Sequence, residues 1–113
     1  MAVFNGAFPV LPGKEDAIRS FTKEVFGSRL EQFNALQAKA GITRETWTLQ
    51  QTPMGSLVLV WFEGDVEKAF ADLATDTDEF PTWFRAQVKD TTGVDLAAPD
   101  GSPPPELLTE WSA

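Results

Sequence analysis

The chain has 113 residues and a net charge of −8, and it contains no histidine, cysteine or tyrosine. Without thiols or imidazoles, disulfides, thiolate nucleophiles, Ser-His-Asp triads and histidine-bound metals or haem are excluded. The negative charge repels phosphate groups and anionic lipid surfaces, so we expect no nucleic-acid partner and no membrane association. With 42% hydrophobic residues, nine Phe and four Trp, the composition predicts a single cytoplasmic domain over residues 1–113, built on one core.

The first forty residues predict a strand followed by a long helical segment. Residues 2–11 alternate loosely between apolar and small or polar residues, which is typical of a strand. Between residues 14 and 40 the apolar side chains recur at steps of three and four, which is typical of an amphipathic helix on a sheet. Gly27 interrupts this pattern, and Ser28 with Glu31 fits a capping box. The segment is therefore either two helices or one kinked helix.

Two strands with a tight turn between them follow. Residues 45–52 and 57–63 have strand character, and the second is a continuous apolar run that predicts burial on both faces. The intervening Pro-Met-Gly sequence favours a three-residue hairpin loop in which Thr52 faces Ser56. This register predicts the opposed pairs Trp47 with Trp61, Leu49 with Leu59, Thr48 with Val60, Thr46 with Phe62, and Glu45 with Glu63.

The last fifty residues predict two helices, a linker and a final strand. Asp65 is a candidate N-cap for a helix over residues 66–74, and Asp78 is one for a second helix that ends before Gly93. Residues 97–105 are rich in Pro and Gly and form a linker. Residues 106–111 alternate enough to predict a terminal strand.

This order of elements predicts an α+β fold of the ferredoxin-like βαββαβ type. The sheet is expected to be antiparallel, with an extra helix after the second helix. A central strand that is apolar on both faces needs a second cover besides its own helices, and a partner subunit is the simplest one.

Four stretches of the chain also resemble an uncharacterised bacterial family of small proteins that is similar to the dimeric α+β barrel superfamily. These stretches are LPGKEDAIRSF, GITRETWTLQQTPMGSLVLVW, FPTWFRAQVKDTTGVDL and SPPPELLTEW. The resemblance implies that two subunits pack sheet on sheet into a barrel, with a small-molecule cleft between each sheet and its helices. Most sites in the superfamily depend on His or Tyr, which this chain lacks, so the resemblance transfers no activity.

Six residues are candidate ligand contacts. Trp47, Trp61 and Trp83 could stack on a planar molecule, although large aromatic side chains more often fill a core. Arg44 and Arg85 could hold a carboxylate or an enolate, although each could equally pair with a neighbouring acid.

Glu45 is the sixth candidate. In the predicted register it lies opposite Glu63, and two neighbouring carboxylates can share one raised pKa that suits proton transfer. The alternative is that both side chains are solvated at the strand ends.

Three functions are compatible with these features. The first is a homodimeric α+β barrel that binds an apolar or aromatic small molecule without catalysis and without a cofactor or metal. The second is a cofactor-independent monooxygenase or isomerase acting on an aromatic or polyketide-like substrate. The third is a structural interaction module.

Overall fold

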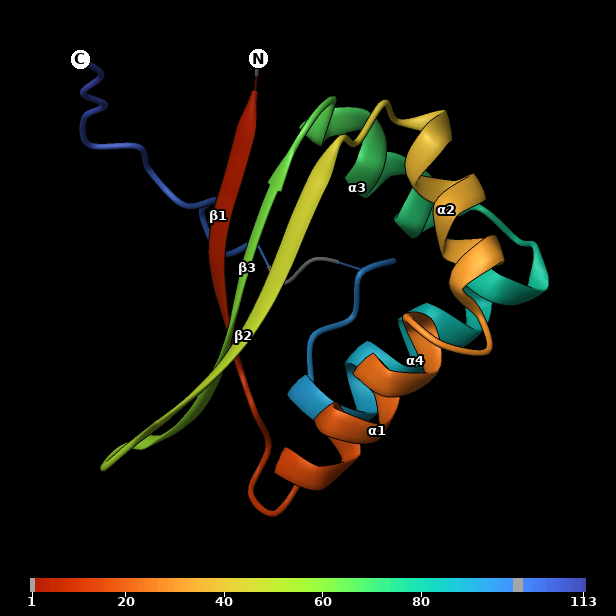
Figure 1. Ribbon diagram of the computed structural model, residues 1–113. Coiled ribbons are helices and arrows are strands. Elements are labelled where there is room, and N and C mark those ends of the chain that lie inside the picture. Colours follow the sequence, from red (N-terminus) through yellow and green to blue (C-terminus); the bar gives the residue numbers. More distant parts are fainter. Residues whose placement is uncertain (1, 99–100) are drawn as a thin grey trace.

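A three-stranded antiparallel sheet with four helices on one of its faces forms the computed structural model, which describes residues 2–98 and 101–113 (Figure 1). The elements in chain order are β1 (Val3–Pro9), α1 (Glu15–Val25), α2 (Leu30–Lys39), β2 (Arg44–Thr52), β3 (Gly55–Glu63), α3 (Val66–Thr75) and α4 (Glu79–Thr92). The predicted α+β class is confirmed. Within the described residues, no helix has both the length and the apolar character that crossing a bilayer requires.

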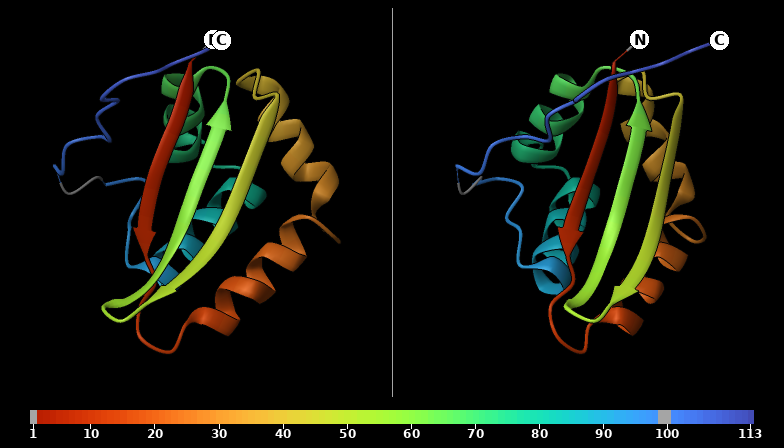
Figure 2. Two further views of the ribbon diagram at one scale, coloured as in Figure 1. Left: turned by 60° about the vertical axis from the view of Figure 1, so that its left-hand side comes forward. Right: turned by 90° about the vertical axis from the view of Figure 1, so that its left-hand side faces the viewer.

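The sheet has the order β1-β3-β2, so the apolar strand β3 is central as its composition predicted. Burial alternates along β1 and along most of β2, because successive side chains point to opposite faces. In the central strand β3, Leu59, Val60 and Trp61 are all partly buried. Glu45 and Trp47 of β2 lie on the helix-covered face together with Val58 and Val60 of β3. The right-hand view in Figure 2 looks onto the opposite face, which the helices leave uncovered.

The predicted hairpin register is wrong by one residue. Thr52 pairs with Gly55, not with Ser56, because the loop contains two residues. The Thr52 hydroxyl closes this tight turn by accepting a hydrogen bond from the backbone N–H of Met54 (3.2 Å) and donating to the carbonyl of Gly55 (2.6 Å). A shift of one residue moves every partner to the opposite face of the sheet.

The shift separates the pairs that the sequence had placed together. Trp47 lies opposite Val60 on the helix side, and Trp61 lies opposite Thr46 on the uncovered side. Glu63 is paired with Arg44, so the predicted carboxylate pair of Glu45 and Glu63 does not exist.

The helical segment over residues 14–40 is two helices. The chain turns between Phe26 and Arg29, and α2 begins after Arg29, which has no side-chain capping bond. The predicted capping box of Ser28 and Glu31 therefore does not form. The Asp65 cap does form, since its carboxylate accepts a hydrogen bond from the Lys68 backbone N–H (3.0 Å).

The predicted terminal strand over residues 106–111 is also absent. This segment pairs with no strand in the described part of the chain, and its large apolar side chains are exposed: Leu107 by 73%, Leu108 by 86% and Trp111 by 84%. The described sheet therefore has three strands, and the fourth strand of a complete ferredoxin-like βαββαβ fold is missing from it. The alternating pattern was too short to specify a pairing partner.

The core lies between the sheet and the helices. Its larger cluster is contributed by α1, α2 and α4, with Trp47 packed against it from the sheet. The buried members are Phe21, Val25, Phe33, Leu36, Phe80, Phe84 and Val88. Between the helices and the sheet, beside Trp47, this layer leaves a space lined by side chains. Figure 1 shows the helices on one side of the sheet.

Candidate functional site

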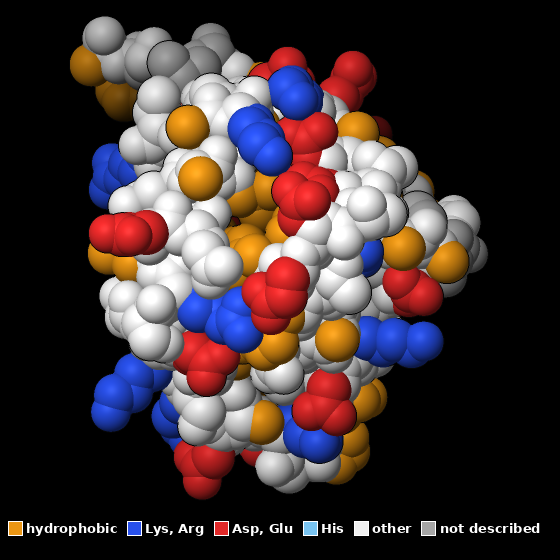
Figure 3. All heavy atoms as spheres, turned by 90° about the vertical axis from the view of Figure 1, so that its right-hand side faces the viewer, with side chains coloured by type: hydrophobic (Ala, Val, Ile, Leu, Met, Phe, Trp, Pro, Cys, Tyr) orange, Lys and Arg blue, Asp and Glu red, His pale blue; other side chains and the backbone are white. Residues whose placement is uncertain are grey.

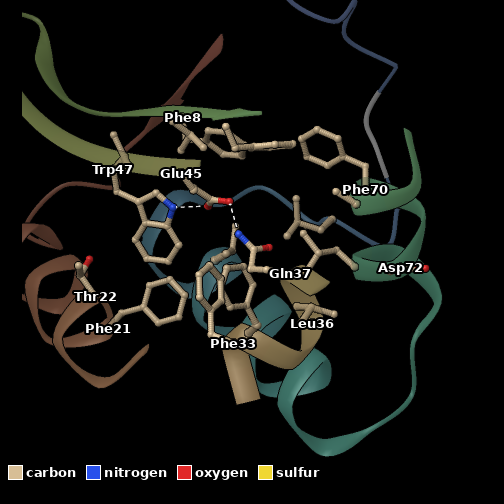
Figure 4. Close-up of a pocket in the computed structure, with 18 of the residues that line it drawn as sticks. Phe8, Phe21, Thr22, Phe33, Leu36, Gln37, Glu45, Trp47, Phe70 and Asp72 are labelled. Carbon is tan, nitrogen blue, oxygen red and sulfur yellow. Dashed lines mark hydrogen bonds between the residues drawn. The ribbon is translucent and has the colours of Figure 1, made fainter. Parts of the chain in front are cut away.

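An apolar cavity of about 90 Å³ lies between the helix-covered face of the sheet and the helices (Figure 4). Its wall is mainly aromatic and aliphatic, and every helix and strand contributes to it. Leu96, from the segment after α4, also lines it. An apolar space with few polar groups is typical of small-molecule sites, so this cavity is the candidate functional site.

The alternation of β2 brings two functional side chains into the same wall. Glu45 and Trp47 are two residues apart, so both point from the strand toward the helices. The Trp47 indole Nε1 donates a hydrogen bond to one carboxylate oxygen of Glu45 at 2.5 Å. Gln37 of α2 donates to the other oxygen through its side-chain nitrogen at 2.8 Å. Glu45 is therefore held in a fixed orientation by two neutral donors (Figure 4).

The environment of Glu45 changes its protonation. Burial raises the pKa of the Glu45 carboxyl above its usual value, because an apolar wall solvates the charged form poorly. The hydrogen bonds from Trp47 and Gln37 oppose this effect on the pKa, since both favour the carboxylate. A carboxyl group of this kind can accept a hydrogen bond, pair with a cation or exchange a proton with a bound molecule.

Aromatic rings surround Trp47 on the side away from Glu45. Its ring stacks on Phe21 with the centroids 5.5 Å apart, and it meets Phe26 (5.1 Å), Phe33 (6.1 Å) and Phe84 (5.9 Å) edge to face. These geometries are the favourable ones for aromatic pairs. Trp47 therefore packs against the core and also lines the cavity.

The wall contains a second acidic residue but no basic one. Asp72 of α3 lines the side of the cavity away from Trp47 (Figure 4). Its carboxylate is paired with Lys68 one helical turn earlier, at 3.0 Å. Among the lining residues neither Lys nor Arg occurs. Glu45 therefore supplies the one charge in this wall that no cation of the described chain neutralises.

The structure places the other predicted site residues outside this wall. Trp61 lies on the uncovered face beneath the Arg44 guanidinium, 5.5 Å from the ring centroid. Trp83 packs against Phe21 and carries the Arg29 guanidinium at 4.1 Å. Of the six candidates, the cavity wall contains Glu45 and Trp47.

Arg85 has a local structural contact. It donates hydrogen bonds of 2.7 Å to the backbone carbonyls of Leu73 and Asp76, at the end of α3. Its guanidinium thus satisfies carbonyl groups that a helix end leaves unpaired.

Sequence reasoning did not identify Gln37, which orients Glu45. A signal was available, because Gln37 follows Phe33 by four residues and so lies on the apolar side of its helix. A polar side chain at such a position requires a hydrogen-bond partner. The partner lies on another element, β2, so local patterning could not name it.

A surface groove of about 240 Å³ lies near the cavity, between α2 and the connection from α3 to α4. Figure 3 shows this side of the molecule, where hydrophobic side chains are visible in a hollow edged by charged ones. Leu36 lines both the groove and the cavity. The two spaces are therefore neighbours that share this side chain.

Comparison with protein-family models, with curated proteins and with solved structures finds no match to this chain. The resemblance to the dimeric α+β barrel superfamily accordingly stays a prediction from the sequence. Functional inference for this chain therefore depends on the geometry and chemistry of the cavity.

Proposed function

We propose that the protein binds a small, largely apolar molecule in the cavity beside Glu45 and Trp47. The observation that carries this proposal is the combination of an apolar, aromatic wall with one oriented carboxyl group. An empty core space costs stability, because its lining atoms lose dispersion contacts, and a ligand would restore them. A fixed polar group in such a wall supplies specificity.

The volume restricts the ligand. An apolar cavity of about 150 Å³ accommodates benzene, whereas this cavity measures about 90 Å³. A short branched aliphatic molecule such as isobutylamine is about as large as benzene, so it too requires the lining side chains to adjust. An aromatic ring requires lining side chains such as Leu36 to move toward the groove.

Titration followed by two-dimensional amide NMR tests this proposal. The panel contains benzene, indole, isobutanol and isobutylamine. We expect at least one compound to cause saturable shifts confined to residues that line the cavity. The matched control is Ala69→Leu, which adds bulk to the wall from α3, and it should abolish those shifts while thermal unfolding remains cooperative. The proposal would be refuted if no compound of the panel caused saturable shifts, or if Ala69→Leu bound a compound as tightly as the wild type does.

A second candidate function is proton-transfer isomerisation, and the position of Glu45 favours it. A carboxylate in an apolar site can take a proton from a carbon next to a carbonyl group and return it to another carbon, so no co-reactant is consumed. The Glu45→Gln variant cannot take up the proton. The Glu45→Asp variant keeps a carboxylate but carries it on a shorter side chain. Loss of turnover in Glu45→Gln with ligand binding retained would distinguish this activity from binding alone.

We infer in addition that the partner on the uncovered sheet face is a second copy of this chain. Leu57, Leu59 and Trp61 form an apolar row along the central strand there. The tail over residues 101–113 passes in front of this side of the sheet near the start of β1 (Figure 2). Its exposed Leu107, Leu108 and Trp111 offer apolar surface to a copy packed on that face. The acidic Glu106 and Glu110 complement Arg44.

A further inference from the structure

The Glu45 carboxylate has hydrogen-bond donors but no counter-ion among the described residues. Its two donors, the Gln37 amide and the Trp47 indole, are both neutral. The other acid of the wall, Asp72, has Lys68 beside it. Glu45 is half-buried, and a charge that is partly removed from water without an opposite charge destabilises the folded protein. A cationic ligand would supply the missing partner.

The carboxylate also has unused capacity. An ionised carboxylate offers about four lone-pair sites on two oxygens. Each oxygen of Glu45 accepts one hydrogen bond from the protein. Sites therefore remain for a donor group that enters from the cavity.

The rest of the wall favours a cation over an anion or a neutral polar group. The faces of aromatic rings attract cations through their quadrupoles, most strongly in a site shielded from water. Phe21, Phe33 and Trp47 supply such rings in the wall of the same cavity (Figure 4). With a net charge of −8, the whole molecule concentrates cations and repels anions.

We propose that the cavity recognises a protonated apolar amine, whose ammonium group pairs with the Glu45 carboxylate while its hydrocarbon part lies against the aromatic wall. This assignment rests on the proposed binding function and specifies its ligand class. Gln37 and Trp47 act as positioning residues, because they hold the carboxylate toward the ligand.

A matched series of isobutyl compounds tests the assignment. Isobutylamine, isobutanol and isovalerate share one branched hydrocarbon group and differ in carrying a positive, a neutral or a negative end. We expect isobutylamine to bind at least about tenfold more tightly than isobutanol, as is typical of charge-assisted hydrogen bonds, and isovalerate not to bind. If isobutanol binds in the cavity as well as isobutylamine does, the amine assignment is wrong and the binding function stands. If none of the panel compounds binds there, the binding function itself is wrong.

Two variants with the same loss of charge locate the interaction. Glu45→Gln removes the carboxylate in the cavity. Glu63→Gln removes one at the end of β3, opposite Arg44 in the strand register. We expect Glu45→Gln to lose at least about tenfold in affinity for isobutylamine while keeping its affinity for isobutanol. Glu63→Gln should bind both compounds as the wild type does. Equal weakening in the two variants would mean that the net charge attracts the amine, and the site assignment would fail.

The pH dependence gives an independent readout. Asp72 with its partner Lys68 is the other ionisable group in the described wall. Affinity for isobutylamine should fall as the pH is lowered through the pKa of Glu45, which burial raises. In Glu45→Gln the affinity should not change over the same interval. If the affinity for isobutylamine fell equally in the wild type and in Glu45→Gln, the assignment would be contradicted.

Discussion

At the scale of single residues, burial makes Glu45 a destabilising charge at neutral pH. Its pKa is higher in the folded chain than in the unfolded chain, so between these two values the folded chain binds more protons. The contribution of Glu45 to the free energy of unfolding is therefore greatest at pH values below the pKa that Glu45 has in the unfolded chain. It is lost as the pH rises through the folded pKa.

We predict that Glu45→Gln unfolds at a higher temperature than the wild type at neutral pH, and that the advantage shrinks in acid. The Gln37 amide can rotate to accept a hydrogen bond from the new side chain, so the local contacts survive. Circular dichroism melts at a series of pH values measure the difference. A variant that is less stable by the same amount at every pH would show that the lost hydrogen bonds outweigh the removed charge.

Two acids outside the cavity wall, Glu79 and Asp76, act in the opposite direction and provide an internal reference. A hydrogen bond from Arg29 lowers the pKa of Glu79, and the backbone N–H of Asp78 lowers the pKa of Asp76. Their stabilising contribution is lost as the pH falls through these lowered values. The loss should be the same in the wild type and in Glu45→Gln, so the difference between the two melts isolates Glu45.

At the scale of elements, Gly64 lies in the connection from β3 to α3, against the connection from α2 to β2. Its φ of 151° is rarely adopted by other residues, and an added Cβ would lie 2.7 Å from the Gly41 carbonyl oxygen and 2.8 Å from Ile42 Cα. Its backbone N–H donates to the Ala2 carbonyl at 3.0 Å. The end of α2, the start of β2 and the start of β1 are thus brought together around a position that has no room for a side chain.

We predict that Gly64→Ala lowers the free energy of unfolding by about 3 kcal/mol, from backbone strain plus the clash. The matched control is Gly41→Ala, where φ is 62° and a Cβ would meet nothing within 4 Å. This control should cost about 1 kcal/mol, from backbone conformation alone. Urea unfolding measures both values. Equal losses would show that the neighbouring backbone of Ile42 moves aside without cost.

At the scale of the whole molecule, the uncovered sheet face predicts a homodimer. We expect the wild type to sediment as a dimer at micromolar concentration and Leu59→Asp to sediment as a folded monomer, because Leu59 is central on that face. Met54→Asp introduces the same charge at the hairpin tip, where Met54 is 98% exposed, and should leave the dimer intact. A stable interface of this type buries about 2,000 Å² or more. A monomeric wild type would refute the dimer.

Val60 would be the wrong position for this experiment. In the register predicted from the turn sequence, Val60 and Trp47 lie on opposite faces of the sheet. In the structure it lies across from Trp47 and lines the cavity. A charge at Val60 would therefore damage the core of one subunit, and its effect would not report on assembly.

The sequence by itself determined the position and type of the three strands and of the helices, and it marked Gly27 as the point where the long helical segment either breaks or kinks. These features follow from the spacing of apolar residues and from caps, which are local properties of the chain. It also identified Trp47 as a ring that could stack on a ligand. It identified Glu45 through a predicted pairing with Glu63 that the structure does not form.

Only the tertiary structure decided which of the candidate site residues lie next to one another. The hairpin register depends on hydrogen bonds within the turn, and a difference of one residue placed Trp61 on the far side from Trp47. The partner of Glu45 on α2 became known only once that helix was packed on the sheet. The fourth strand was not formed, because a short alternating segment becomes a strand only when an edge pairs with it. The protonation of Glu45 depends on this packing, since burial and hydrogen-bond partners shift the pKa of a carboxyl group.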